Sequence, residues 1–380
     1  MPHVRVLLQR LHDGDHVVLG NAEQHLQVVS TSGDSTWRGA VRISRPDDHW
    51  IIEGDGGPLS GRAAESMSLD LFGDGVLPGA KGEPDRRYPG QFRVVVTDGV
   101  EGWSLINVVT MEQYLPGVLQ AELFAGWPAA TFEAQAVAAR SFATMQVLQR
   151  SHAAWDVTDT PATQAYMGHA TNDEAWAAVY ATEGELLLFN DALVPGYFSS
   201  CCGGLPALGV DAVGPHEANA IAPLAGHGSP IQCSDAPVYA WTRTVPAEGV
   251  HEALQKWAVE TGTSDIGRLQ GVEQIESAAH NPHGRATMLR ITDRGGNEIV
   301  LTCGNLVSAL ASLPQGPLMS GWCTGVRQGD DIVFEGRGYG HGAGLCQYGA
   351  ARMGEAGQSA REILEFYYPG AAIEQRWGNR

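Results

Sequence analysis

The most restrictive feature of this chain is a run of alternating glycines near its C-terminal end. From Gly336 to Gly344, in the sequence GRGYGHGAG, every second residue is glycine, and His341 lies within the run. Alternating glycines remove side chains from an extended segment, so that a ligand or a neighbouring strand can touch the main chain. The run therefore forms either the floor of a binding cleft or a tight packing surface beneath the alanine-rich segment 129–146. We favour the cleft floor.

The composition argues against several classes of protein. The 380 residues are enough for two or three domains, and the formal net charge is −19, with lysine only at positions 81 and 256. No basic run could neutralise phosphates, so nucleic acid and anionic membranes are poor partners. No segment approaches the ~20 apolar residues of a membrane span. Arg5 and Arg10 interrupt the only apolar run at the start, so we expect a cytoplasmic protein or a chain that begins after a leader.

Changes along the chain predict an α+β fold in four parts. Residues 1–109 contain short runs of β-formers between Asp-Gly and Gly-Asn turns, which indicates a β-rich N-terminal domain. Residues 110–246 contain helical spacing and a hairpin, and we expect them to form the first part of a catalytic core. Residues 247–317 are predicted to be an inserted α+β segment. Residues 318–380 are predicted to complete the core with the glycine-rich strand and a C-terminal helix.

Local signals place several boundaries. Two helix starts carry capping-box residues, and two pairs of strands are joined by turn sequences. The capping boxes are Thr110 with Gln113 and Ser359 with Glu362, and the turns are 97–102 and Asn190-Asp191.

Common catalytic signatures are absent. Neither lysine follows a glycine, as a P-loop requires, and the glycines of 336–344 do not have the G-x-G-x-x-G spacing of dinucleotide-binding proteins. The chain also lacks a G-x-S-x-G elbow and an H-E-x-x-H zinc motif. Frequent hydrolase and nucleotide chemistries therefore become poor explanations.

Three less common clusters remain, and together they indicate a family. They are YLPGVLQAELFAGWP with EAQAVAARSFA, then YFSSCCGG, and finally GRGYGHGAGLCQYGA followed by ILEFYYPGA. In this order the chain resembles the stage II sporulation protein D family, which includes peptidoglycan lytic transglycosylases and amidase-enhancer proteins. The resemblance is dense over residues 88–204 and 318–370. It implies an envelope protein that cleaves peptidoglycan glycan strands between N-acetylmuramic acid and N-acetylglucosamine without hydrolysis, preferably strands without stem peptides.

The resemblance assigns the catalytic acid/base to Glu122. This residue follows an apolar helical segment and is surrounded in sequence by Leu119, Leu123, Phe124 and Trp127. Burial among them would favour the neutral acid, which can protonate a glycosidic oxygen. The resulting carboxylate can then deprotonate the 6-hydroxyl of the sugar, so that one residue serves as acid and then as base. The alternative is a capped or solvated glutamate at a helix end.

Two further residues are candidates through the same resemblance. Arg140 occupies the place of a functionally important arginine and could hold a glycan carboxylate or lactyl group. Its alternative is an ion pair with Glu112 or Glu133. Tyr368 could hydrogen-bond sugar hydroxyls, or it could be a core aromatic of the last helix.

The remaining candidate contacts to substrate surround the glycine run. His341 and Gln347 would project from a bare floor toward the hydroxyls of a sugar chain. Ser199 and Ser200 would line the same cleft, unless they are ordinary edge-strand serines.

Neither a metal nor a cofactor is predicted. Some family members hold zinc in the loop that here reads HAAWDVTDTPATQAY, but only His152 is retained of its ligands. Thr158, Ala162 and Thr163 occupy the other places, so we expect that site to be empty.

Four of the six cysteines leave alternatives open. Cys201, Cys202, Cys233 and Cys346 could form a thiolate metal site with His341, a disulfide, or free thiols. We favour a disulfide or free thiols over a metal. Cys346 also departs from the family, which more often has serine there.

Two rival functions remain. One is a non-catalytic wall-binding protein that activates an N-acetylmuramoyl amidase, which would then be a partner. The other is a cysteine-based metal or redox protein.

Overall fold

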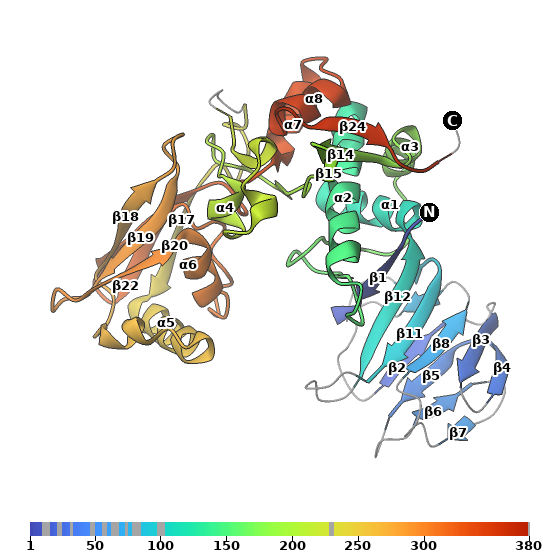
Figure 1. Ribbon diagram of the computed structural model, residues 1–380. Helices are drawn as coiled ribbons and strands as arrows, with labels where there is room; N and C mark the ends of the chain where they lie inside the picture. Colours follow the sequence, from blue (N-terminus) through green and yellow to red (C-terminus); the bar gives the residue numbers. More distant parts are fainter. Residues whose placement is uncertain are drawn as a thin grey trace. The chain divides into compact units, whose positions relative to one another are not determined.

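The computed structural model describes most of the chain in two compact units. The described residues are 1–380 without 10–15, 21–24, 31–32, 46–49, 55–58, 62–67, 73–74, 78–84, 97–102, 228–231 and 379–380. The first unit comprises Met1–Leu186 and Glu374–Arg380, and the second comprises Leu187–Ile373. Both contain helices and strands, and the N-terminal region is rich in strands (Figure 1). The predicted α+β class with a β-rich N-terminus is confirmed.

The first unit begins with strands that pair mostly antiparallel. Its strands are β1 (His3–Leu7), β2 (His16–Leu19), β3 (His25–Ser30), β4 (Gly33–Arg38), β5 (Val41–Ser44), β6 (Trp50–Glu53), β7 (Leu59–Gly61), β8 (Ser68–Phe72), β9 (Gly75–Leu77), β10 (Arg86–Tyr88), β11 (Gln91–Val95), β12 (Ser104–Thr110) and β13 (Val157–Thr158). The largest sheet has the order β13-β1-β12-β11-β8-β3-β4, and a second sheet has the order β2-β5-β6-β7.

The hairpin predicted before the first helix is present. Strands β11 and β12 pair antiparallel with Val95 opposite Ser104. The turn 97–102 lies outside the described residues. Strand β1 pairs with the other edge of β12, and its Val4 and Val6 side chains are fully buried. The alternation of buried and exposed side chains along β1 is the period expected for a strand with one face on the core.

Three helices follow the strands: α1 (Met111–Glu122), α2 (Ala129–Gln149) and α3 (Asp173–Ala181). The capping box predicted at Thr110 is wrong. Its hydroxyl donates to the side-chain Oε1 of Gln113 at 2.8 Å and caps no backbone N–H group. Two polar side chains at this spacing can bond to one another instead of to the helix end. At α3, Asn172 does cap the helix, accepting from the Ala175 N–H at 3.0 Å.

A buried ion pair connects α1 to α2. Arg140 is completely buried and donates from Nη2 to Glu112 Oε2 at 2.8 Å and from Nε to Glu112 Oε1 at 3.1 Å. Its Nη2 also donates to the Val179 carbonyl of α3, and the indole of Trp377 donates to Glu112 Oε1 at 2.8 Å. The pair thus ties three helices and the C-terminal segment of this unit together.

The second unit is also α+β. Its strands are β14 (Glu185–Phe189), β15 (Ala192–Leu193), β16 (Phe198–Ser199), β17 (Ala240–Pro246), β18 (Gln274–His280), β19 (Ala286–Thr292), β20 (Glu298–Thr302), β21 (Cys323–Gln328), β22 (Asp331–Arg337), β23 (Leu345–Cys346) and β24 (Ala372–Gln375); β14 and β24 cross the unit boundary. Its helices are α4 (Gly209–Ala212), α5 (Ala247–Thr261), α6 (Cys303–Ala309), α7 (Gln347–Glu355) and α8 (Ala360–Tyr367), with short 3₁₀ helices at Glu217–Asn219, Ala222–Leu224 and Ser264–Arg268.

Two local predictions in this unit are confirmed. Asn190 and Asp191 have φ of 51° and 62°, the left-handed pair of a two-residue hairpin turn between β14 and β15. Ser359 and Glu362 form a complete capping box at the start of α8.

A sheet with the order β17-β22-β21-β18-β19-β20 provides the main core of the second unit. Helices α5 and α6 pack on one side of it (Figure 1), and Leu254, Leu306, Ile291 and Phe334 are fully buried between these layers. Among the described residues, no helix is both long and apolar enough to span a membrane.

Replacing Arg140 with alanine is expected to destabilise the protein strongly. The change leaves the Glu112 carboxylate buried without its cation, which typically costs about 3–5 kcal/mol. The matched control is Arg268→Ala, which breaks an ion pair with Asp265 whose two side chains are 72% and 66% exposed. Such pairs contribute little. Thermal melting of both variants tests this, and equal melting temperatures would contradict a stabilising role for the buried pair.

Candidate functional site

Glu122 lies at the C-terminal end of α1 and is half-buried. The backbone N–H of Ala165 donates to its Oε1 at 2.9 Å. Leu123 is buried beside it, whereas Phe124 is 58% exposed and meets the Trp127 ring edge-on at 5.2 Å. The carboxyl group is therefore fixed in direction at the edge of an apolar region that is partly open to solvent.

The loop that provides Ala165 is anchored to both neighbouring helices. The Tyr114 hydroxyl of α1 donates to Gln164 Oε1 at 3.1 Å, and Gln164 Nε2 donates to the Ala139 carbonyl of α2 at 3.2 Å. Gln164 is completely buried. Because Ala165 follows it directly, these bonds also fix the amide that contacts Glu122.

The same loop is the one in which the sequence resemblance predicts a zinc site without its metal. Here the Thr158 and Thr163 hydroxyls lie 3.1 Å apart, and Thr163 Oγ1 accepts from the Thr158 N–H at 3.0 Å. Thr160 extends the network with a 3.0 Å contact to Thr158. His152 and Ala162 are exposed. Hydrogen bonds from threonine hydroxyls to one another and to the backbone thus connect Thr158, Thr160 and Thr163.

Arg140 and Tyr368 lie in the protein interior. Arg140 has the Glu112 ion pair that the sequence left open as its alternative. Tyr368 is fully buried, donates to the Tyr197 carbonyl at 2.6 Å and accepts from the Leu345 N–H at 3.3 Å; burial raises its pKa. These positions do not support the expectation that the two side chains bind substrate directly. Long polar side chains can satisfy their hydrogen bonds inside the protein, which a motif alone does not reveal.

The glycine run is not the extended segment that we expected. Strand β22 ends at Arg337, and glycines in the left-handed region follow, with φ of 80° at Gly342 and 67° at Gly344. A Cβ on Gly342 would lie 2.7 Å from Arg285 Cζ, and one on Gly344 would lie 2.1 Å from the Tyr197 carbonyl oxygen. These glycines therefore serve sharp turns and close packing within the second unit rather than an empty floor.

The run brings several predicted residues together. The Gly342 N–H donates to Ser199 Oγ at 3.2 Å, and the rings of His341 and Tyr197 meet edge-on at 6.0 Å. Strand β16 pairs in parallel with β23, which places Ser199 opposite Cys346. The two sequence clusters YFSSCCGG and GHGAGLCQYGA thus form one structural element.

The residues predicted to contact substrate differ in how exposed they are. His341 and Ser200 are half-buried, while Ser199 and Gln347 are 7% and 3% exposed. The Ser200 carbonyl accepts from the Tyr348 N–H at 3.1 Å, near the start of α7. Only His341 and Ser200 of this group present a substantial surface.

His341 is held as a neutral ring. Its Nδ1 accepts from the Ala343 N–H at 3.1 Å. Burial and the nearby charge of Arg285 lower the pKa of His341 from 6.5 to about 4, and a hydrogen bond with the Phe198 backbone acts in the opposite direction. At neutral pH the ring is therefore uncharged, and it is hydrogen-bonded to the backbone at Ala343 and Phe198.

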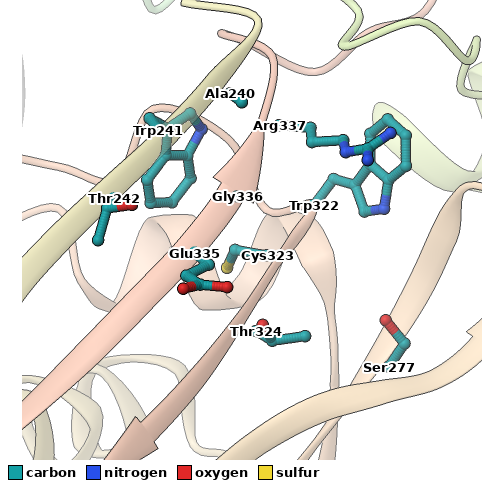
Figure 2. A pocket seen from close by; sticks show the side chains of 10 residues that line it. All are labelled: Ala240, Trp241, Thr242, Ser277, Trp322, Cys323, Thr324, Glu335, Gly336 and Arg337. Carbon is teal, nitrogen blue, oxygen red and sulfur yellow. The ribbon is translucent and has the colours of Figure 1, made fainter.

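Sequence reasoning missed a pocket of about 490 Å³ on the second unit's sheet (Figure 2). Thr242, Glu335 and Thr324 lie opposite one another on β17, β22 and β21 and supply polar groups. The Trp322 ring lies under the guanidinium of Arg337, with 5.6 Å from Cζ to the ring centroid. The alternation in DIVFEGR and CTGVRQ is the signal for such a polar face.

A smaller pocket of about 170 Å³ lies at the glycine run itself. Gly340, His341, Arg285, Trp322 and Cys303 are among its lining residues. His341 therefore faces a hollow surface of the second unit.

Comparison with known proteins identifies the relationship. An uncharacterized protein of Brachyspira hyodysenteriae is 30% identical over 273 residues, which cover 71% of this chain and 68% of that protein. The family described as "SpoIID: Stage II sporulation protein" matches residues 100–189. The chain belongs to the SpoIID family.

Two SpoIID relatives have informative names. Stage II sporulation protein D of Bacillus subtilis is 27% identical over 290 residues, covering 71% of this chain and 76% of that protein. The amidase enhancer of Bacillus subtilis is 24% identical over 295 residues, covering 68% of this chain but only 40% of that protein.

The SpoIID match and a second match cover different candidate residues, and Ser199, Ser200, Gln347 and Tyr368 lie outside both. Glu122, Arg140 and the threonine-containing loop lie within the SpoIID match. The family "Domain of unknown function (DUF8618)" matches residues 217–344, which include His341 and the sheet pocket.

Gly344→Ala is expected to destabilise the protein more than Gly262→Ala. Both glycines have nearly the same φ, 67° and 70°, so both variants incur the left-handed cost of about 1–2 kcal/mol. A Cβ added at Gly262 would have no atom within 4 Å, whereas one at Gly344 would meet the Tyr197 carbonyl. The difference in melting temperature between the two variants measures the cost of the contact between the added Cβ and the Tyr197 carbonyl. Equal decreases in melting temperature would show that packing at Gly344 is unimportant.

His341 is expected to make the fold acid-sensitive. Because its pKa of about 4 lies below the ordinary 6.5, the unfolded chain binds the proton more readily in this interval. Stability should therefore fall as pH decreases from about 6.5 toward 4. His341→Gln should flatten this part of the profile of melting temperature against pH.

The control for that measurement is His280→Gln, at an exposed position of the same unit. A His341→Gln profile as steep as the wild-type profile, or equal flattening in the control, would contradict the assignment.

Proposed function

We propose that this SpoIID protein is a peptidoglycan lytic transglycosylase that uses Glu122 as its single acid/base. Its substrate would be the bond between N-acetylmuramic acid and N-acetylglucosamine, and preferred strands would lack stem peptides. The protein would act in the cell envelope.

The environment of Glu122 carries this proposal. Its carboxyl group is half-buried beside Leu123, and one oxygen is oriented by the Ala165 amide. The half-buried position limits contact of the group with solvent, while the hydrogen bond from the Ala165 amide fixes its direction. Both features suit a residue that delivers a proton to a bound substrate.

The proposed reaction conserves all atoms without adding water. Protonated Glu122 donates its proton to the glycosidic oxygen as the bond from C1 of the muramic acid to that oxygen breaks. The 6-hydroxyl oxygen of the same muramic acid forms the new bond to C1, and the Glu122 carboxylate takes its proton. The products are a 1,6-anhydro end and a free 4-hydroxyl on N-acetylglucosamine. An internal nucleophile replaces the second carboxylate that hydrolysing glycosidases normally use.

The other predicted residues receive proposed supporting roles. Arg140 would be a positioning residue, because its ion pair fixes α1, the helix that ends at Glu122. His341 and Ser200 would contact sugar hydroxyls. The buried Ser199, Gln347 and Tyr368 would maintain the shape of the glycine run.

A second candidate function is activation of an N-acetylmuramoyl amidase without catalysis. The relative named amidase enhancer favours it. In that case the chain would bind peptidoglycan and an amidase, and Glu122 would have only a structural role.

Glu122→Gln is expected to abolish turnover of peptide-free glycan strands. Removing the proton-transfer group should slow the reaction by at least roughly 10²–10⁴-fold. Mass spectrometry should detect wild-type products lighter than hydrolytic ones by the mass of one water. Glu174→Gln changes an exposed carboxylate of the same unit and should remain active.

The same preparations separate the two candidate functions. If the wild type yields no anhydro products but stimulates an added amidase, and Glu122→Gln stimulates it equally, the enzyme proposal is wrong. Hydrolytic products from the wild type would also contradict the internal nucleophile.

A further inference from the structure

Three cysteine sulfurs from separate segments meet inside the second unit, and a fourth lies beside one of them. The Sγ atoms of Cys201, Cys233 and Cys346 all lie within 4.8 Å of one another, and all three residues are buried. Cys202, also buried, has its Sγ 3.6 Å from that of Cys233. Because the pair Cys201-Cys202, Cys233 and Cys346 are far apart in the chain, the fold and not the local sequence brings these three segments together.

The spacing of the Cys202 and Cys233 sulfurs suits two ligands of one shared cation, and the other two sulfurs lie within 4.8 Å of that of Cys233. A tetrahedral zinc ion with Zn–S bonds of about 2.3 Å holds its sulfurs roughly 3.8 Å apart. A disulfide would require a separation of about 2.05 Å. The observed 3.6 Å between Cys202 and Cys233 is close to the first value and far from the second.

Backbone amides are directed at the sulfurs. The Cys202 N–H donates to Cys346 Sγ at 3.4 Å, and the Gly204 N–H donates to Cys202 Sγ at 3.3 Å. The Gly203 N–H donates to Cys201 Sγ at 3.5 Å. The two glycines have φ of 73° and 98°, which turns their amides toward the sulfurs. N–H donors stabilise thiolates and are typical supports of metal-bound cysteines.

A buried cation lies next to the cluster. Arg285 is 4% exposed, and its guanidinium donates to the carbonyls of Cys202 and Leu205. Within the described ranges, no carboxylate lies at ion-pair distance from it. A buried charge is costly without a compensating one. Zinc bound by four thiolates carries a net charge of −2 and would supply that compensation.

We propose that Cys201, Cys202, Cys233 and Cys346 bind one Zn²⁺ ion in a closed structural site. Binding converts four thiols to thiolates and releases four protons to solvent, with no change in oxidation state. His341 is not a ligand, because none of its ring nitrogens belongs to the group of sulfurs within 4.8 Å, and the ring is hydrogen-bonded to the backbone at Ala343 and Phe198. This assignment replaces our sequence-based preference for a disulfide or free thiols, which four scattered positions could not resolve.

The site would fix both ends of the glycine run. Cys201 exchanges backbone hydrogen bonds with Tyr339, at 3.1 and 2.8 Å, near the start of the run. Cys346 ends β23 and immediately precedes α7 at the other end. A metal that joins them would hold the segment that presents His341.

Metal analysis of the full chain tests the proposal. Wild-type protein is incubated with Zn²⁺ and then freed of excess metal. Elemental mass spectrometry should then find one zinc ion per chain. Cys202→Ser and Cys346→Ser should lose it. Cys303→Ser, which changes a half-buried cysteine that donates to the Ala286 carbonyl, should retain it. The assignment would be overturned if the control lost zinc equally. It would also be overturned if the double variant Cys202→Ser/Cys346→Ser retained zinc.

Two measurements on the wild type remain decisive if a serine variant fails to fold. Co²⁺ substituted for zinc should give the intense absorption of tetrahedral cobalt thiolates. After chelation and denaturation without reductant, all six cysteines should react with a thiol reagent. Four reactive thiols would indicate a disulfide, and six with no bound Zn²⁺ or Co²⁺ would indicate free thiols. Either result would overturn the proposal.

Discussion

The guanidinium of Arg140 and the carboxylate of Glu112 meet in the interior of the first unit with two parallel contacts, at 2.8 and 3.1 Å. The helix that ends at Glu122 cannot rotate or slide without separating them. The amide of Ala165 faces Glu122 from a loop that is itself bonded to α1 and α2. The direction of the proposed acid therefore depends on an ion pair formed near the start of the same helix. A charged pair suits this task because its two hydrogen-bonded contacts are directional and so define one geometry, which apolar packing does less strictly.

In the second unit, close contacts of the main chain restrict the position of a functional segment in a similar way. Its glycine run approaches Arg285 and the Tyr197 carbonyl more closely than any Cβ would allow. The buried Gly342 amide of this run has a hydrogen-bond partner in Ser199 Oγ. The half-buried His341 is consequently presented on a segment with little freedom to move. Binding groups on such a support lose little conformational entropy when a ligand arrives.

Sequence patterns predicted the positions of helices, strands and turns more accurately than they predicted the environments of individual side chains. The alternation in HVRVL, the Asn190-Asp191 turn and the Ser359 capping box depend on local energetics, so each could be read from a few residues. Thr110 failed because a hydroxyl has several acceptors within reach, and only the folded helix decides between them. Arg140 and Tyr368 were assigned from motifs, but whether they reach a surface depends on packing by residues distant in sequence. The sheet pocket and the meeting of Cys201, Cys233 and Cys346 are likewise products of tertiary pairing.

The indole of Trp377 donates to Glu112 across 265 positions of sequence, and both belong to the same compact unit. During synthesis, the helices of that unit leave the ribosome long before this partner exists. The whole second unit is made in the interval. Closing such a long loop is entropically expensive and slow compared with forming local contacts. The first unit thus completes its interior only after the second has been synthesised, which makes the order of folding events a property of the chain's topology.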